Sequence, residues 1–279
     1  MIRVFVRAFT LALYFLLPSA WAGQVYTLSV VPQFTPVDIG LRWSPLLAHL
    51  EKETGISLQL RMQERIPKFE TDFLAGLPDF VFLNPYHAVM AMKAHGYVPL
   101  VRSGDQLNGI LVVDRNGPIK QLADLAGKTL AFPSPNAFGA SLYMRALLTE
   151  KEKIAFTPSY VGTHQNVYRH VLLGEAPAGG GVAATLEKEN AAMQSRLAVL
   201  YTTPGVASHP LAAHPRVPAK VRERLVEALL KLDRDPAGRK LLAAVELDRT
   251  QLADYARDYA PLEKLKLGQY AQIEKTGDK

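Results

Sequence analysis

The stretch Asp79-Phe80-Val81-Phe82-Leu83-Asn84-Pro85-Tyr86-His87 contains a complete transition from strand to helix. The four apolar residues that follow Asp79 predict a short buried strand. Asn84 is a favoured N-cap residue, and proline is common at the first helical position after it. A buried strand that leads directly into a helix is the repeating unit of an α/β protein.

The same alternation continues on both sides of this stretch. A helical face with Ile39, Trp43 and Leu50 precedes it and ends at Gly55, and Trp43 is predicted to be buried in the core. Strands are predicted at residues 25–31, 57–62, 79–83, 98–102, 108–114, 127–132, 157–161 and 197–201. Helical segments are predicted at 39–55, 67–75, 84–96, 119–125, 140–148 and beyond about 218. The sequence therefore predicts an α/β fold.

The first 22 residues have the pattern of a secretory signal peptide. Arg3 and Arg7 precede an apolar run over residues 8–17, and Ala20-Trp21-Ala22 provides small residues at a cleavage site before Gly23. The apolar run is shorter than the roughly 20 residues that cross a bilayer, although an uncleaved anchor is the alternative. We therefore expect residues 1–22 to be removed and the protein to work in the periplasm.

The amino-acid composition limits the kinds of molecule that the protein is expected to bind. The chain of 279 residues has no cysteine, which excludes disulfides and a lipidated N-terminal cysteine. Its formal net charge is +6, but lysine and arginine are interspersed with acidic residues. No later segment has the length of an apolar bilayer span. We expect a soluble monomer that binds a small molecule and no nucleic acid.

Four loops at the predicted carboxyl ends of strands form the candidate site: residues 32–35, 84–87, 134–139 and 162–165. In open α/β sheets ligands bind outside these strand ends, where helix N-termini favour anions. Each loop alone has the chemistry of an ordinary helix cap, so the prediction depends on their joint placement. The expected ligand-binding residues are Gln33, Phe34, Asn84, Tyr86, Ser134, Asn136, Phe138, Gly139, Ser141, Thr163, His164 and Gln165. His164 is expected to donate to an anionic oxygen, with backbone N–H groups at 136–141 and 163–165.

Motifs for catalysis or cofactors are missing from the sequence. Gly127-Lys128-Thr129 lacks the earlier glycine of a phosphate-binding loop, and Gly179–Gly181 is predicted to be a turn and not a dinucleotide fingerprint. There is no Gly-x-Ser-x-Gly sequence, and the seven histidines lack metal-ligand spacing. The sequence does not exclude a metal site whose ligands come from distant loops. We expect no enzyme activity and no cofactor.

The order of landmarks resembles the periplasmic phosphate, phosphite and phosphonate binding proteins of ABC importers. The matching landmarks are Trp43-Ser-Pro-Leu46, Thr54-Gly55, Gly76-x-Pro-Asp79, Asn84-Pro-Tyr86, Leu122-x-Asp-Leu-x-Gly-Lys128, the loop after Phe132, Gly162-Thr-His164 and Gly174. They extend over nearly all of the chain after the signal peptide. One departure is the loop Ser134-Pro-Asn-Ala-Phe-Gly139, where the family usually has a Ser-x-Ser-Gly run. Another is Ile66 or Phe69 in place of a common tyrosine.

The resemblance implies a type II periplasmic binding fold, in which two α/β lobes enclose a ligand cleft. Lobe 1 is expected at residues 23–112, lobe 2 at 113–203, and residues 204–279 return to lobe 1 with C-terminal helices. The proline-rich turn at 204–218 is the candidate crossing. The implied function is capture of a phosphate- or phosphonate-like oxyanion, or another small polar ligand, for an inner-membrane ABC permease. The alternatives are a periplasmic ligand sensor for a signalling partner and an enzyme on the same scaffold.

Cleavage of the signal peptide is directly testable. We expect the protein exported to the periplasm of a Gram-negative host to begin at Gly23, because the small residues of the cleavage site lie immediately before it. Intact-mass measurement of the periplasmic fraction gives the N-terminus. A mass that includes residues 1–22 would contradict this prediction.

Overall fold

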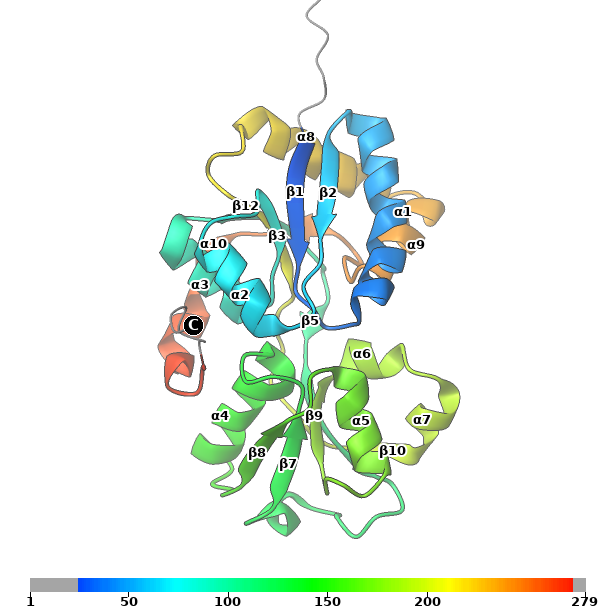
Figure 1. Ribbon diagram of the computed structural model, residues 1–279, viewed down its shortest axis with the longest axis vertical. Coiled ribbons are helices and arrows are strands. Elements are labelled where there is room, and N and C mark those ends of the chain that lie inside the picture. Colours follow the sequence, from blue (N-terminus) through cyan, green and yellow to red (C-terminus); the bar gives the residue numbers. More distant parts are fainter. Residues whose placement is uncertain (1–24, 273–279) are drawn as a thin grey trace, which may run out of the picture.

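The computed structural model describes residues 25–272, which form two α/β lobes stacked along the long axis of the molecule (Figure 1). The predicted signal peptide, residues 1–22, lies outside the described residues. The strands are β1 (Val25–Val30), β2 (Ser57–Arg61), β3 (Phe80–Phe82), β4 (Val98–Arg102), β5 (Gln106–Leu107), β6 (Gly109–Asp114), β7 (Thr129–Phe132), β8 (Thr157–Tyr160), β9 (Gly179–Val182), β10 (Leu197–Thr202), β11 (Val206–Ala207), β12 (Pro210–Ala213) and β13 (Gln251–Leu252).

Helices cover both sheets. The α-helices are α1 (Pro36–Thr54), α2 (Ile66–Leu74), α3 (Pro85–His95), α4 (Tyr143–Glu150), α5 (His164–Leu172), α6 (Ala183–Glu187), α7 (Ala191–Arg196), α8 (Ala219–Leu232), α9 (Pro236–Ala244) and α10 (Tyr255–Asp258). Shorter helical segments are η1 (Leu122–Leu125), η2 (Phe138–Leu142), η3 (Ala260–Leu265) and η4 (Leu267–Gln269). No helix in the described range is long and apolar enough to cross a membrane.

Lobe 1 is built on a six-stranded sheet in the order β13-β4-β12-β3-β1-β2. β2, β1 and β3 run parallel, while β12, β4 and β13 pair antiparallel. The predicted N-cap at Asn84 is confirmed, because its side chain accepts a hydrogen bond from the His87 N–H at 2.8 Å. Trp43 is buried as predicted, with its ring edge-on to Phe82 at 5.1 Å.

Lobe 2 is built on a five-stranded sheet in the order β10-β6-β9-β7-β8. β9, β7 and β8 are parallel, so the carboxyl ends of these strands meet at the edge that faces lobe 1. Helices α4 and α5 begin at this edge (Figure 1). With lobe 1, this arrangement is the type II periplasmic binding architecture that the sequence predicted.

The chain passes between the lobes twice, through an antiparallel ribbon of β5 and β11. β6 belongs entirely to the sheet of lobe 2, so the first passage lies between Arg102 and Gly109, several residues before the expected limit at 112. The second passage lies between Thr202 and Pro210. The expected proline-rich turn at 204–218 also contains β12, a central strand of lobe 1, because its apolar residues Leu211–Ala213 pair with β3 and β4.

The prediction of a turn at Gly179–Gly181 is wrong. These glycines form the buried strand β9, and their backbone φ angles are not positive. Glycine is needed for close approach instead. A Cβ at Gly180 would lie 1.8 Å from the Ala140 carbonyl oxygen and 2.7 Å from the Phe132 ring. The start of the helix at Phe138 therefore packs directly on the backbone of β9.

We expect Gly180→Ala to destabilise the protein by about 3 kcal/mol or more, because the added Cβ has no space against the Ala140 carbonyl. Gly40→Ala is the matched control. It lies inside α1, where the nearest atom to a new Cβ is Met62 Sδ at 3.6 Å, so a gain of about 0.5–1 kcal/mol is expected. Urea unfolding measures both changes. Equal stability of the Gly180→Ala protein and the wild type would contradict the close packing.

Candidate functional site

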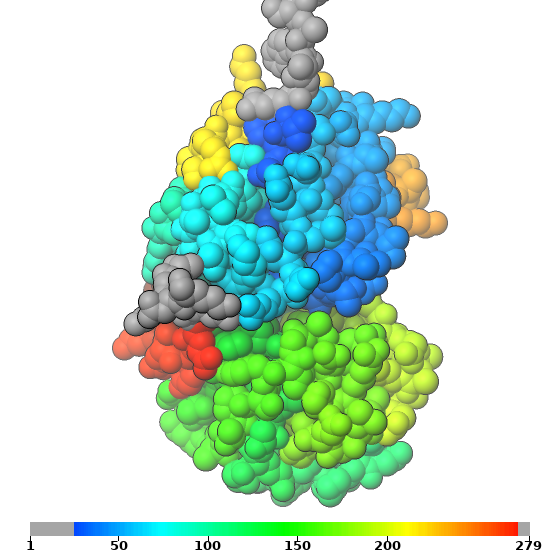
Figure 2. Space-filling model, in the orientation of Figure 1, coloured from blue at the N-terminus to red at the C-terminus, as the bar shows by residue number. Residues whose placement is uncertain are grey.

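A small cavity lies between the two lobes at the carboxyl ends of the parallel strands. It is lined by Val31, Gln33, Ile66, Asn84, Ala137, Phe138, Gly139, Ala140, His164, Val182 and His209. Its free volume of about 10 Å³ is close to the minimum for one water molecule. Figure 2 shows the two lobes pressed together on the visible face. The cleft between the lobes is therefore closed in this structure.

The start of a helix forms one wall of this cavity. Phe138–Leu142 adopts a π-helical turn that continues into α4, and Phe138, Gly139 and Ala140 line the cavity. The first N–H groups of a helix have no acceptor within the helix, and the helix dipole places partial positive charge there. The sequence predicted the helix to begin at Ala140, two residues late. This wall can bind an oxygen atom through backbone N–H groups alone.

His164 lines the same cavity, and the hydroxyl groups of Thr185 and Tyr168 lie on the side of its ring away from the cavity. Thr185 Oγ1 donates to the Val182 carbonyl oxygen at 2.9 Å and lies 2.8 Å from the Tyr168 hydroxyl. The third contact of Thr185 Oγ1 is His164 Nδ1 at 3.2 Å. Because the only hydrogen of Thr185 goes to Val182, His164 Nδ1 is the donor in this contact. Tyr168 is buried behind this network and is not a ligand-facing hydroxyl.

The expectation that His164 donates to an anion is changed by this geometry. Burial lowers the pKa of His164 to about 4, against the raising effect of the Glu246 carboxylate. The imidazole is neutral near pH 7, and its one N–H is used by Thr185. Its other ring nitrogen, Nε2, is therefore an acceptor. A ligand group beside it has to provide the hydrogen.

The sequence analysis missed His209, a second histidine in the cavity wall. Its ring stacks on Phe82 at 5.6 Å, and burial lowers its pKa to about 4. The Glu246 carboxylate lies near both imidazoles and accepts from Gln33 Nε2 at 3.1 Å and Lys188 Nζ at 3.2 Å. Nothing in the local sequence indicated these roles, because His209 follows the second crossing and Glu246 follows α9.

Asn136 connects the lobes and does not line the cavity. Its backbone carbonyl accepts from Asn84 Nδ2 at 3.0 Å, and its own Nδ2 donates to Glu70 Oε1 at 2.8 Å. Glu70 also contacts His87 Nε2 at 2.8 Å. All four side chains are buried. The polar groups of Asn136 and Asn84 are thus used in closing the cleft.

The C-terminal segment lies at the side of the junction between the lobes and contacts both of them beside this network (Figures 1 and 2). The Gln272 backbone N–H donates to Asn136 Oδ1 at 2.9 Å, and its carbonyl accepts from Asn136 Nδ2 at 2.7 Å. The buried Arg145 guanidinium donates to the Tyr270 carbonyl at 2.8 Å, and the Tyr270 hydroxyl bonds to Glu150. These contacts hold the closed arrangement on one side of the cleft.

The other residues expected in the site lie around the cavity or behind it. Phe34 lies under the Arg42 guanidinium, 4.3 Å from the ring centre, and Tyr86 contacts the C-terminal segment near Gly268. Ser141 is buried against Arg145 Nε at 3.1 Å. The Ser134 hydroxyl is buried without a hydrogen-bond partner, Thr163 caps α5, and Gln165 is exposed and donates to Glu189. The structure brings Gln33, Asn84, Phe138, Gly139 and His164 together in the cavity wall.

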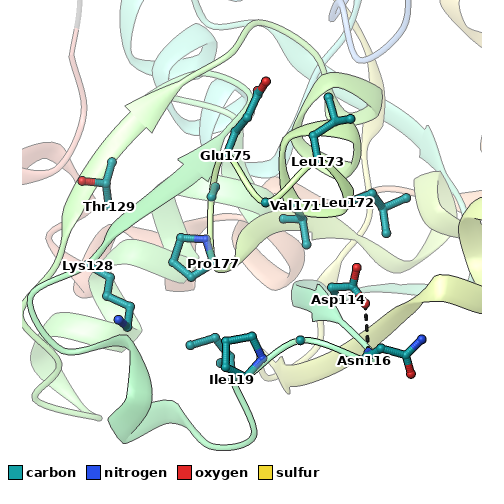
Figure 3. Close-up of a pocket in the computed structure, with 14 residues that line it drawn as sticks. Asp114, Asn116, Ile119, Lys128, Thr129, Val171, Leu172, Leu173, Glu175 and Pro177 are labelled. Carbon is teal, nitrogen blue, oxygen red and sulfur yellow. Dashed lines mark hydrogen bonds between the residues drawn. The ribbon is translucent and has the colours of Figure 1, made fainter.

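A larger hollow of about 650 Å³ lies in lobe 2 (Figure 3). It is formed by the start of β7 and the end of β6, so it is at the edge of the sheet away from the cleft. The charged ends of Lys128, Glu175 and Asp114 point in different directions. We therefore assign the candidate site to the interlobe cavity. No group of three metal-ligating side chains occurs within residues 25–272.

Comparison with known proteins gives a family match over most of the chain. A family model described as "ABC transporter, phosphonate, periplasmic substrate-binding protein" matches residues 28–259. The phosphate-import protein PhnD of Mycolicibacterium smegmatis is 24% identical over 188 residues, which are 59% of this chain. The match spans 57% of the length of that relative.

Solved structures share the fold at low sequence identity. PhnD1 of Prochlorococcus marinus, in complex with methylphosphonate, has a TM-score of 0.79 and 17% identity, with 88% of this chain and 98% of that chain covered. A binding protein component of an ABC phosphonate transporter from Pseudomonas aeruginosa has a TM-score of 0.78 and 15% identity. That alignment covers 88% of this chain and 87% of the other.

The two neutral imidazoles predict a loss of stability in acid. An unfolded histidine has a pKa of about 6.5, so the unfolded chain binds protons before His164 and His209 do. Stability present above about pH 6.5 is lost as the pH falls toward 4, by about 2 kcal/mol per imidazole between pH 7 and pH 5. Urea unfolding should show a smaller pH effect for His164→Gln than for the exposed control His49→Gln. Identical pH effects in both variants would contradict burial of a neutral His164.

Proposed function

Because the chain belongs to the family of periplasmic substrate-binding proteins of phosphonate ABC transporters, we propose that it captures a small phosphorus oxyanion between its lobes and delivers it to an ABC permease. Another small polar ligand of similar size would use the same cavity. The protein acts in the periplasm after loss of residues 1–22. It binds its ligand as a monomer, without catalysis and without a cofactor.

The observation that carries this proposal is the convergence of three helix starts on one closed cavity. Asn84 caps α3 in lobe 1, while Phe138–Ala140 and His164 begin two helices of lobe 2. Helix N-termini attract anions through free N–H groups and the helix dipole. At α3 and α5 the caps Asn84 and Thr163 already bind one N–H each. The N–H groups of Phe138–Ala140 are therefore the principal anion contact.

This chain binds the oxyanion with fewer hydroxyl groups than the resemblance led us to expect. Phe138 stands in the loop where the family usually has serine, and its ring stacks on Tyr143 at 5.5 Å. Ser141 is buried against Arg145. Backbone N–H groups remain as the donors near the cavity, because the Gln33 amide donates to Glu246 and the Asn84 amide donates to the Asn136 carbonyl. A small ligand with an apolar substituent suits this mixture of donors and apolar walls.

Entry of a ligand requires the lobes to separate, because the closed cavity holds no more than about one water molecule. The β5–β11 ribbon and the two passages beside it are the connections about which the lobes can rotate. Closure then joins the apolar residues Phe138, Ala140 and Val182 to the core of lobe 1. Burial of these side chains favours the closed, ligand-bound state.

The test is thermal unfolding of the protein from Gly23 with phosphate, phosphite, methylphosphonate, methanesulfonate and acetate. A ligand at about 100 times its Kd stabilises the folded state by about 2.7 kcal/mol, which raises Tm by roughly 5–10 °C for a chain of this size. We expect this shift with at least one phosphorus oxyanion.

The variants separate cavity binding from binding elsewhere. His164→Ala should abolish the shift, because it removes a wall of the cavity, whereas the exposed control His49→Gln should keep it. Failure of every oxyanion to raise Tm would contradict the proposed function. A shift that survives His164→Ala would place the ligand outside this cavity.

A further inference from the structure

The carboxylate of Glu246 lies close to the cavity, and the backbone of this residue has an unusual conformation. It follows α9 and has φ of 63°, in the left-handed region that residues with a Cβ seldom adopt. Its side chain is 14% exposed and contacts both lobes, through Gln33 in lobe 1 and Lys188 in lobe 2. Gln33 lines the cavity, so the carboxylate lies directly behind the cavity wall.

Lys188 offsets the charge of Glu246, and Arg42 adds one further positive charge to the same wall. Lys188 pairs with Glu246 at 3.2 Å, and Arg42 lies over the Phe34 ring in the same wall. Glu189, which follows α6, accepts a hydrogen bond from Gln165 at the exposed side. Arg42 is held over the Phe34 ring, and the helix starts are the positive groups that line the cavity itself, each with only about half an elementary charge.

The hydrogen bonds around His164 independently favour a ligand that can donate a hydrogen bond. His164 donates its Nδ1–H to Thr185, so its Nε2 is an acceptor. An ionised carboxylate such as Glu246 is also an acceptor only. A ligand that carries a hydrogen on one oxygen satisfies an acceptor in this wall, whereas a fully deprotonated oxyanion brings a lone pair against it.

We propose that Glu246 and His164 together make the cleft select singly charged oxyanions over doubly charged ones. This inference rests on the proposed function and deepens it. A singly charged ligand such as the methylphosphonate monoanion is balanced by the helix starts and keeps an O–H for His164. A second negative charge on the ligand lies beside Glu246, whose own charge already offsets Lys188, in a closed cavity where water does not screen it.

The protein's own charges stay constant over the pH range in which the ligand titrates. His164 and His209 have pKa values of about 4, so both are neutral above about pH 6. Burial raises the pKa of Glu246, but the charge and hydrogen bond of Lys188 hold it below its usual value, so the carboxylate is ionised in this range. A change in affinity above about pH 6 therefore reports the protonation of the ligand.

The experiment is calorimetric titration with two probes from pH 6 to pH 8.5. Methylphosphonate loses its second proton, an O–H, in this range, whereas hypophosphite carries one charge and no O–H throughout, so that hypophosphite tests the charge alone. In the wild type, methylphosphonate affinity should fall about tenfold for each pH unit above its second pKa, because only the protonated form binds. Hypophosphite affinity should stay constant. Glu246→Gln should flatten the methylphosphonate profile, and Glu189→Gln, the matched control, should leave it as in the wild type.

The measured quantity is the ratio of the methylphosphonate affinity to the hypophosphite affinity. A variant that merely opens the lobes lowers both affinities equally and leaves this ratio unchanged. A wild-type methylphosphonate affinity that does not change with pH would overturn the proposal and leave the proposed function in place. An unchanged slope in Glu246→Gln would do the same. If neither probe binds to the wild type or to either variant at any pH, the proposed function fails and the proposal fails with it.

Discussion

Close backbone packing at the start of α4 is the constraint on which the site depends. The carbonyl oxygen of Ala140 lies on Gly180, and that of Gly139 lies on Gly109, where a Cβ would come within 2.1 Å of it. A side chain at either strand glycine would push the helix start away from the sheet. Because these positions are glycine, the N–H groups of Phe138–Ala140 reach the cavity at a fixed place. The anion contact that we propose is thus produced by packing, not by a run of hydroxyl groups.

Closure of the cleft uses polar groups that could otherwise have bound a ligand. Asn136 gives its side chain to Glu70 and to the backbone of Gln272, and its carbonyl to Asn84. On the other side, Lys188 reaches Glu246 across the lobes. Each pair forms only where the lobes meet, so these contacts add to the stability of the closed state. In the proposed function, these contacts couple ligand binding to lobe closure from outside the cavity.

The electrostatics of the cavity follow from burial. Two imidazoles enclosed by apolar walls are neutral, since desolvation disfavours their charged form. Glu246 keeps its charge because Lys188 lies within hydrogen-bonding distance. The cavity combines weak positive potential from helix starts with acceptors that require a hydrogen. This combination suits an oxyanion that is not fully deprotonated.

Local sequence patterns were sufficient to predict most of the helices and strands and the family. Apolar runs such as Phe80–Leu83 could only be buried strands, and the caps at Asn84 and Thr163 start helices through contacts within a few residues. Tertiary structure decided which polar residues face the cavity. Asn136 and Ser141 had the expected chemistry but face other partners, and the Ser134 hydroxyl is buried without one. His209 and Glu246 reach the cleft from the distant return to lobe 1. The glycine strand β9 was missed for the same reason, because its need for glycine arises from Ala140, forty residues earlier in the chain. Helix caps and hydrophobic periodicity depend on residues that are close together in the sequence, so they can be predicted from it. Contacts between the lobes join segments that are far apart in the sequence and meet only in the folded protein.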